Sequence, residues 1–282
     1  MKAYIVCHPG GEPRYGWHSA GDAFLVDWNK NSGKDPDKHT RKFILRPGLA
    51  LSAIDGRTMR DNLVFWGEYE AYSRARLLQK NDKEYPKAVH DILYPASGNF
   101  SYPQYGLNTD PYVYGDEFYY FCCERKDSGE QKYKPDDVIL FGSINRRGNS
   151  YFFELDTVFV VKCYRSIEDF DKNSQYYKIG IRPHLDAQIR KGRSIEEFGE
   201  VVVGRMYGEG SDLYSYVPAL PITSDNALKF RKPKLDLSLL GLKDIRNFQM
   251  NYLPFEFSKK KWKILTNKIL RTHKLACYID EI

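Results

Sequence analysis

The stretch "DDVILFGSINRRGNSYFFELDTVFVVKCY", residues 136–164, carries the clearest strand pattern of the chain. Two runs rich in β-branched and aromatic residues flank "INRRGNS", in which Gly148 and Asn149 are typical of a hairpin loop. The run "FELDTVFVV" is apolar enough for a strand buried in a barrel. The stretch therefore predicts two adjacent strands of a β-rich fold.

Shorter runs of the same kind predict further strands elsewhere in the chain. These runs are "KAYIVC" (2–7), "AFLVDW" (23–28), "FILRPG" (43–48), "EFYYFCC" (117–123) and "GEVVVGRMYG" (199–208). Pro and Gly are frequent in residues 85–111, for which we expect a long loop.

Two segments predict helices. In the first, Gly67 is expected to form a bend, and a short helix is predicted near residues 71–80. In the second, Trp262 and Leu265 belong to an apolar series at helical spacing, which predicts a basic amphipathic helix at about 258–275.

The chain of 282 residues is long enough to bury a hydrophobic core, and no linker divides it. We predict a single α+β domain over residues 1–282, with a barrel-like core at about 60–165. Its centre is a mixed, mainly antiparallel β-sheet or barrel, and the helices are peripheral.

The N-terminal apolar run is too short for a signal peptide, and no later window is long enough to span a membrane. We therefore expect a cytoplasmic protein without a membrane partner. The five cysteines form no CxxC pair, which argues against a disulfide framework and a zinc site. No metal and no cofactor are predicted, and the oligomeric state stays open.

Charge and aromatic content both bear on the ligand. The net charge of +6 permits binding of nucleic acid or another polyanion, although the charge is spread along the chain. The 22 Tyr, 16 Phe and 4 Trp residues suit a β-rich fold and also sites that stack flat ligands. The usual motifs of P-loop, dinucleotide-binding, zinc-protease and serine-hydrolase enzymes do not occur.

The segment "FWGEYEAYSRARLL", residues 65–78, contains two nearby carboxylates, Glu68 and Glu70. On an extended segment both would point to one face, where they could divide acid and base roles. Alternatively they form a solvated pair balanced by Arg74 and Arg76. The sequence leaves both interpretations open.

Three aromatic residues in the same segment, Trp66, Tyr69 and Tyr72, recur at every third position. Together they could stack a base or cage a cation. Such a stripe is also typical of a hydrophobic core.

Polar residues in two loops are further candidates for ligand binding. Asn108, Asp110 and Asp116 lie around a Pro and a Gly, where Asx side chains form turns and could also bind a hydroxyl group or a cation. Their spacing matches no EF-hand. His8 and His18 lie beside glycines that permit close backbone approach to a ligand.

Two basic segments, "RKPK" at 231–234 and "SKKKWK" at 258–263, interleave positive charge with Trp262. Such segments suit phosphate contacts. A charge run on a helix is equally typical of a solvated surface.

Three blocks carry a resemblance to known proteins: "NTDPYVYGDEFYYF" (108–121), "KPDDVILFGS" (134–143) and "YFFELDTVFVV" (151–161). Their order resembles the strands of PUA-like barrels, the superfamily of ASCH and EVE domains. The string "FWGEYEAYSR" (65–74) resembles prokaryotic proteins grouped as nucleotide-modification-associated domains. The resemblance implies a β-barrel that binds a modified base or nucleotide in an aromatic-lined cleft. The ASCH motif G-x-K-x-x-E-x-R does not occur here, so no catalytic residue is carried over.

The leading hypothesis is a protein that binds a nucleotide or a modified nucleic-acid base. The three aromatics would stack the base, Glu68, Glu70 and Asn108 would recognise its edge, and Arg74 or Arg76 would contact phosphate.

Two rival hypotheses remain. The chain could be a hydrolase or transferase acting on a nucleotide or glycoside, with Glu68 and Glu70 as acid and base and Asp110 or Asp116 orienting the substrate. It could also be a non-catalytic scaffold whose aromatics form the core.

Overall fold

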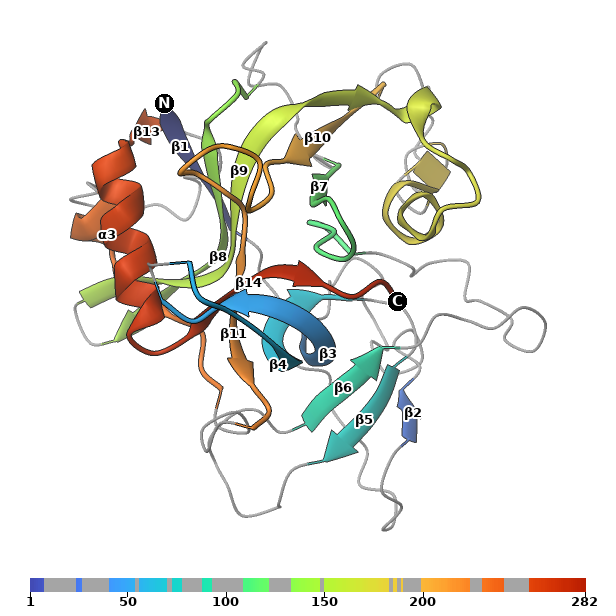
Figure 1. The fold of residues 1–282 in the computed structure, drawn as a ribbon, viewed down its shortest axis with the longest axis horizontal. Coiled ribbons are helices and arrows are strands. Elements are labelled where there is room, and N and C mark those ends of the chain that lie inside the picture. Colours follow the sequence, from blue (N-terminus) through green and yellow to red (C-terminus); the bar gives the residue numbers. More distant parts are fainter. Residues whose placement is uncertain are drawn as a thin grey trace.

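The computed structural model describes residues 1–7, 24–26, 41–53, 56–69, 73–77, 88–92, 109–121, 133–147, 150–182, 185–186, 189, 199–223, 230–240 and 254–282. These residues form two mixed, mainly antiparallel β-sheets with few helices (Figure 1). The predicted α+β fold is therefore confirmed. Within the described ranges, no helix has both the length and the apolar character needed to cross a membrane.

The first sheet has the strand order β13-β1-β8-β9-β10-β7, and β12 pairs with β9. Its longest pair is the antiparallel hairpin of β8 and β9, which confirms the strands predicted from residues 136–164. The sheet is mixed because β1 runs parallel to β8. Its strands are β1 Lys2–Cys7, β7 Tyr119–Tyr120, β8 Val138–Arg147, β9 Ser150–Ser166, β10 Glu200–Gly204, β12 Lys234–Asp236 and β13 Phe255–Glu256.

The second sheet has the order β14-β11-β4-β3-β6-β5-β2, and β14 also pairs with β3. This extra pairing closes β3, β4, β11 and β14 into a four-stranded ring. The strands are β2 Phe24–Val26, β3 Arg41–Leu51, β4 Thr58–Glu68, β5 Ser73–Leu77, β6 Ala88–Ile92, β11 Val217–Pro221 and β14 Lys274–Ile279. The strand β6 lies within residues 85–111, for which the sequence predicts a loop.

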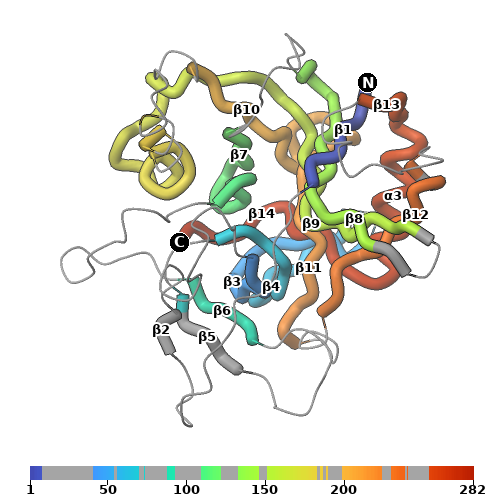
Figure 2. The backbone as a smooth tube through the Cα atoms, turned by 180° about the vertical axis from the view of Figure 1, so that it is seen from behind, coloured from blue at the N-terminus to red at the C-terminus, as the bar shows by residue number. Residues whose placement is uncertain are grey.

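The two sheets meet along a shared aromatic core. A bridge between Val158 and Tyr216 joins β9 to the residue that precedes β11. Buried side chains of both sheets, such as Phe141 and Phe65, belong to one hydrophobic cluster between them. Figure 2 shows β9 and β11 running close together at this junction.

The helix α3, Lys259–Leu270, packs on the first sheet through Trp262, Leu265 and Ile269. Its N-terminus is capped by Ser258, whose side chain accepts a hydrogen bond from the Lys261 amide at 3.2 Å. The predicted basic helix is therefore confirmed, but it is shorter than 258–275. The apolar run that follows pairs with β11 and β3 as the strand β14, because burial on both faces favours a strand there.

The remaining helical elements are short. They are η1 Ile167–Asp169, η2 Tyr177–Ile181 and η5 Leu237–Leu240.

The prediction of a helix near residues 71–80 is wrong for the part of this segment that the structure describes. Ser73–Leu77 form β5, which pairs with both β6 and β2. Gly67 forms no bend, because β4 continues through it to Glu68, opposite Arg41. In "SRARL" the side chains alternate between small or apolar and charged, which fits the strand period, and pairing on both edges outweighs the helical spacing.

Replacement by alanine should affect stability differently at two glycines of the sheets, Gly142 and Gly67. At Gly142 a Cβ atom would lie 2.1 Å from the Glu154 carbonyl oxygen and 2.6 Å from the Phe153 ring, which leaves no space. At Gly67 its nearest neighbour would be the flexible end of Ile44 at 3.2 Å. We expect Gly142→Ala to lower the free energy of unfolding by at least about 2 kcal/mol. We expect Gly67→Ala to stay within about 1 kcal/mol of wild type in chemical denaturation. A large loss at Gly67 would contradict its place inside a continuous strand.

Candidate functional site

A buried ion cluster lies where the two sheets meet. Arg41 at the start of β3 forms a hydrogen-bonded ion pair with Glu68 at the end of β4. The guanidinium also lies 3.6 Å from an oxygen of Asp156, which belongs to β9 of the other sheet. All three side chains are at most 4% exposed. Burial of three charges is costly unless they are paired, so this arrangement requires an explanation.

Lys232 extends this group toward the surface. Its Nζ lies 3.4 Å from Asp156 and 3.5 Å from Glu154, and it donates a hydrogen bond to Ser143 Oγ at 2.8 Å. The same ammonium group lies 5.4 Å from the centre of the Trp66 ring. We call Arg41, Trp66, Glu68, Glu154, Asp156 and Lys232 the Asp156 cluster.

Several polar atoms of the cluster are buried without a hydrogen-bond partner among the described residues. They are both carboxylate oxygens of Asp156, Nε of Arg41 and Nε1 of Trp66. Buried polar groups are normally satisfied, because a lost hydrogen bond costs about 1–3 kcal/mol. The cluster therefore retains one carboxylate acceptor and two N–H donors for a further partner.

The pairing of β3 with β4 brings part of the cluster together. Arg41 is opposite Glu68, and Phe43 is opposite Trp66, so these side chains share one face of the sheet. Phe43 packs on Trp66 with ring centres 4.5 Å apart, which fixes the indole.

Asp156 reaches the cluster through an irregularity in the β8–β9 hairpin. Phe141 is opposite Thr157 and Gly142 is opposite Leu155, so Asp156 is the extra residue between two paired positions. Such bulges redirect a side chain and are frequent beside functional sites. Gly142 permits the close backbone approach at this point.

Burial raises the pKa of Asp156, although the nearby charges of Lys232 and Arg41 oppose the shift. Burial also raises the pKa of Cys7, the last residue of β1, to about 11, and the negative charge of Asp156 adds to this effect. Cys7 is therefore a thiol at neutral pH rather than a reactive thiolate.

A second buried polar group lies on the opposite face of β3. Lys42 donates a hydrogen bond to Ser73 Oγ at 2.6 Å, and this oxygen lies 2.9 Å from Nδ1 of His90. Burial and the charge of Lys42 lower the pKa of His90 to about 2. The imidazole is therefore neutral, and its Nδ1 can accept a hydrogen bond from the Ser73 hydroxyl group.

This neutral histidine makes stability dependent on pH. Below about pH 6.5 the unfolded chain protonates His90 while the folded chain does not, so folding stability falls as the pH decreases. When the pH is lowered from about 7.5 to about 5, the neutral buried His90 should reduce the free energy of unfolding by about 2 kcal/mol. We expect His90→Asn to lose less stability than wild type over this interval, measured by urea denaturation at each pH. Parallel losses in both proteins would contradict a neutral buried His90.

The residues predicted from sequence are only partly brought together. Trp66 and Glu68 both belong to the Asp156 cluster. Tyr69 instead packs against Tyr114 in the core between the sheets, with ring centres 6.4 Å apart. Trp66 and Tyr69 therefore form no common stacking surface.

The other predicted residues are distributed as follows. Asp110 is buried and accepts a hydrogen bond from the Phe121 amide at 3.0 Å, whereas Asp116 is exposed. Arg74 and Arg76 lie on β5 and not on a helix. The residues outside the described ranges are His8, His18, Glu70, Tyr72 and Asn108.

Sequence reasoning missed Arg41, Glu154 and Asp156 as site residues, and it included Lys232 only in the basic segment 231–234, as a residue that could contact phosphate. Asp156 does carry a signal, because an acidic residue inside the apolar run "FELDTVFVV" is expected to be buried and therefore paired. Arg41 carries no comparable local signal.

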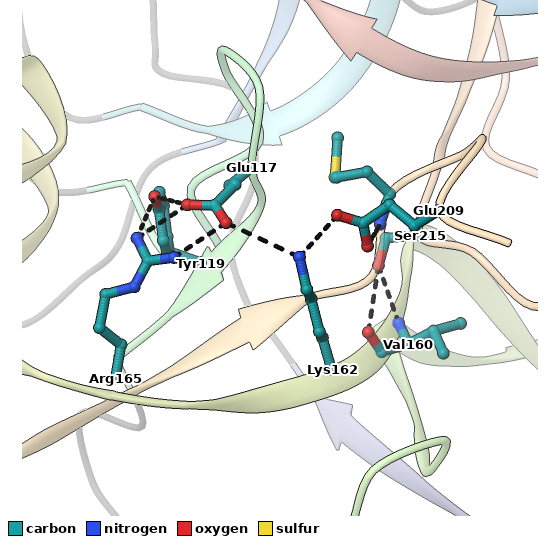
Figure 3. Close-up of polar contacts among 8 residues, drawn as sticks. Glu117, Tyr119, Val160, Lys162, Arg165, Glu209 and Ser215 are labelled. Carbon is teal, nitrogen blue, oxygen red and sulfur yellow. Dashed lines mark hydrogen bonds and ion pairs between the residues drawn. The ribbon is translucent and has the colours of Figure 1, made fainter. Parts of the chain in front are cut away.

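A separate ion-pair network lies at the surface near β7 and β10. Arg165 binds both oxygens of Glu117, at 2.8 and 2.9 Å, and Lys162 pairs with Glu209 at 2.6 Å (Figure 3). Partial burial raises the pKa of Glu117, but hydrogen bonds from Arg165 and Tyr119 outweigh it and the net shift is downward. These carboxylates are already paired and partly exposed, so the network is typical of surface stabilisation.

Compared with known protein families, curated proteins and solved structures, the chain shows no match. In the parts of the chain that are described, no three His, Cys, Asp or Glu side chains are grouped as metal ligands would be. Function must therefore be argued from the Asp156 cluster itself.

Proposed function

We propose that the Asp156 cluster binds the base of a nucleotide or of a modified nucleic acid. The observation that carries this proposal is the Asp156 carboxylate, which is buried between two cations whose nitrogen atoms lie 3.4 and 3.6 Å away and which receives no short, well-aligned hydrogen bond from the described chain. A ligand that donates hydrogen bonds to this carboxylate would relieve the cost of its burial.

The neighbouring atoms favour a heteroaromatic base. Bases present donors and acceptors side by side on one edge, and proteins recognise unstacked bases by these edges and by aromatic stacking. Asp156 supplies acceptors, whereas Nε of Arg41 and Nε1 of Trp66 supply donors. The Trp66 ring supplies a flat apolar surface next to these groups.

Lys232 has a distinct role in this proposal. It lies over Trp66 in the structure and is the least buried cation of the cluster, with a side chain 14% exposed. A base that stacks on Trp66 would displace the ammonium group from the ring. Lys232 would then pair with the phosphate of the same nucleotide.

Two conservative variants test the base site by isothermal titration calorimetry with a panel of nucleosides and nucleoside monophosphates. Trp66→Phe keeps an aromatic ring and removes the unpartnered N–H, so affinity should fall about fivefold to tenfold. The smaller ring leaves space in the core, so the free energy of unfolding should fall by about 1–2 kcal/mol while the fold is kept. Asp156→Asn should reduce affinity about tenfold or more, because it removes a charged acceptor.

The matched control is Glu209→Gln, a carboxylate outside the cluster, which should bind as wild type does. Nucleotides that bind both cluster variants as tightly as wild type, or a panel without any ligand, would refute the proposal. Thermal denaturation of each variant separates lost affinity from misfolding.

A hydrolase or transferase is the second candidate, and one observation favours it. Glu68 and Asp156 share the Arg41 guanidinium, and the pKa of Asp156 is raised by burial. Carboxylates with different environments can divide acid and base roles. Asp156 would protonate a leaving base, and ionised Glu68 would accept a proton from the attacking water.

The two candidates predict different kinetics, which chromatography of free base released from nucleosides would measure. An enzyme whose acid is Asp156 should lose kcat as the pH rises through the raised pKa, and Asp156→Asn should remove this dependence. Glu68→Gln should retain binding but abolish turnover. Ligand binding without any turnover by the wild type would reject the enzyme and leave the binder.

A further inference from the structure

The exposed face of α3 carries several basic residues, together with the exposed Ile264. Lys259, Lys260 and Lys263 are exposed on it, and Arg271 follows at the C-terminal end. The helix contains no acidic residue between Lys259 and Leu270. Lys259, Lys260 and Lys261 occupy the first turn of the helix, where the helix dipole disfavours positive charge. Helix stability therefore does not explain this pattern.

A second basic segment lies beside the C-terminal half of the helix. Lys268 of α3 lies 3.7 Å from Asp236 of β12, and Nε2 of His273 donates a hydrogen bond to the Arg231 carbonyl oxygen at 2.7 Å. Figure 2 shows β12 next to α3. The fold thus joins "RKPK" at 231–234 to the helix face, although the two are distant in the sequence.

The combined surface adjoins the Asp156 cluster. Lys234 is 53% exposed and pairs with Glu154, which is 20% exposed. Two residues earlier, Lys232 is 14% exposed and lies against Asp156, which is 2% exposed. Exposure therefore falls in steps from the basic surface into the cluster.

We propose that the ligand of the cluster is a base within a single-stranded nucleic acid, whose phosphates lie along α3 and residues 231–234. This inference rests on the proposed base-binding function. A base paired inside a duplex is stacked and unavailable to a buried site, whereas a single strand can insert one base. The exposed lysines supply the electrostatic contacts that hold a backbone without reading its sequence.

The length of the surface suits several phosphates. A helix of 12 residues is about 18 Å long, which spans several nucleotides of a strand at about 3.4 Å each. Two acidic residues, Asp236 and Glu256, also lie near this surface. Asp236 is paired with Lys268, so the basic character along the exposed side of the helix persists.

Fluorescence anisotropy of the full chain with a labelled single-stranded DNA or RNA of about 16 nucleotides tests the inference. The variant Lys260→Glu/Lys263→Glu should weaken binding at least tenfold and reduce the slope of log affinity against log salt by about 1 to 2. Its affinity for a nucleoside monophosphate should not change, because the cluster is intact.

The control variant is Lys172→Glu/Lys178→Glu, which makes the same charge change at two exposed lysines of the segment 167–182. This segment lies across the molecule from α3 (Figure 1). It should bind the oligonucleotide within about twofold of wild type. Equal losses in both variants would overturn the inference, because the effect would then reflect net charge alone.

Vesicles containing phosphatidylserine test another polyanion, because Ile264 is 42% exposed on the same helix. Loss of vesicle binding in the α3 variant with unchanged oligonucleotide binding would overturn the inference in favour of a lipid surface.

The variants Trp66→Phe and Asp156→Asn show whether the base site or the basic surface of α3 is at fault if binding does not follow the expected pattern. If Trp66→Phe and Asp156→Asn bind nucleotides as wild type does while the α3 variant loses the oligonucleotide, the base site fails and the backbone surface stands. If these two variants lose nucleotides while the α3 variant keeps the oligonucleotide, the backbone surface fails and the base site stands.

Discussion

The structure depends on a buried arginine that joins the two sheets. Arg41 belongs to the second sheet, pairs with Glu68 of the same sheet, and also contacts Asp156 of the first. Desolvation of such charges is offset only if their partners hold them in good geometry, and removal of one partner commonly costs about 3–5 kcal/mol. A continuous apolar interface would stabilise this junction at lower cost. Burial of these charges therefore has a cost that the proposed ligand would offset.

The position of Asp156 follows from the same constraint. A regular β8–β9 ladder would place successive side chains on alternating faces, but the bulge opposite Phe141 and Gly142 adds one residue at Asp156. Gly142 has no Cβ, so the Glu154 carbonyl can approach it closely. A glycine in one strand thus determines where a carboxylate of the neighbouring strand points.

The sequence predicts the parts of this arrangement that depend on local pattern. Periodicity and turn residues identified the β8–β9 hairpin, the strand β10 and the helix α3, and the segment after Phe65 contains Trp66 and Glu68, which lie in the Asp156 cluster. The same pattern failed at Ser73–Leu77, where pairing with two neighbouring strands decides the conformation. The grouping of Arg41 and Lys232 around Asp156 could not be found, because these contacts join residues that are 115 and 76 positions apart in the chain. The bulge also interrupts the alternation of side chains between the two faces of β9, so the sequence pattern does not predict the face on which Asp156 lies.

Three polar groups among the described residues differ in how much of their hydrogen-bonding capacity remains unused. The Glu117 and Arg165 pair is bidentate and partly solvated, so its hydrogen-bonding capacity is used within the protein. The hydrogen bonds that link Lys42, Ser73 and His90 are buried, and they satisfy one another. Lys42 donates to the serine oxygen, and the neutral imidazole can accept a hydrogen bond from the serine hydroxyl group. In the Asp156 cluster, by contrast, charge is paired at 3.4 and 3.6 Å while the carboxylate accepts no hydrogen bond from the described residues. Coulomb attraction at these distances holds the carboxylate in place without saturating its lone pairs. A group that is positioned by charge and still able to accept hydrogen bonds is suited to recognise a ligand.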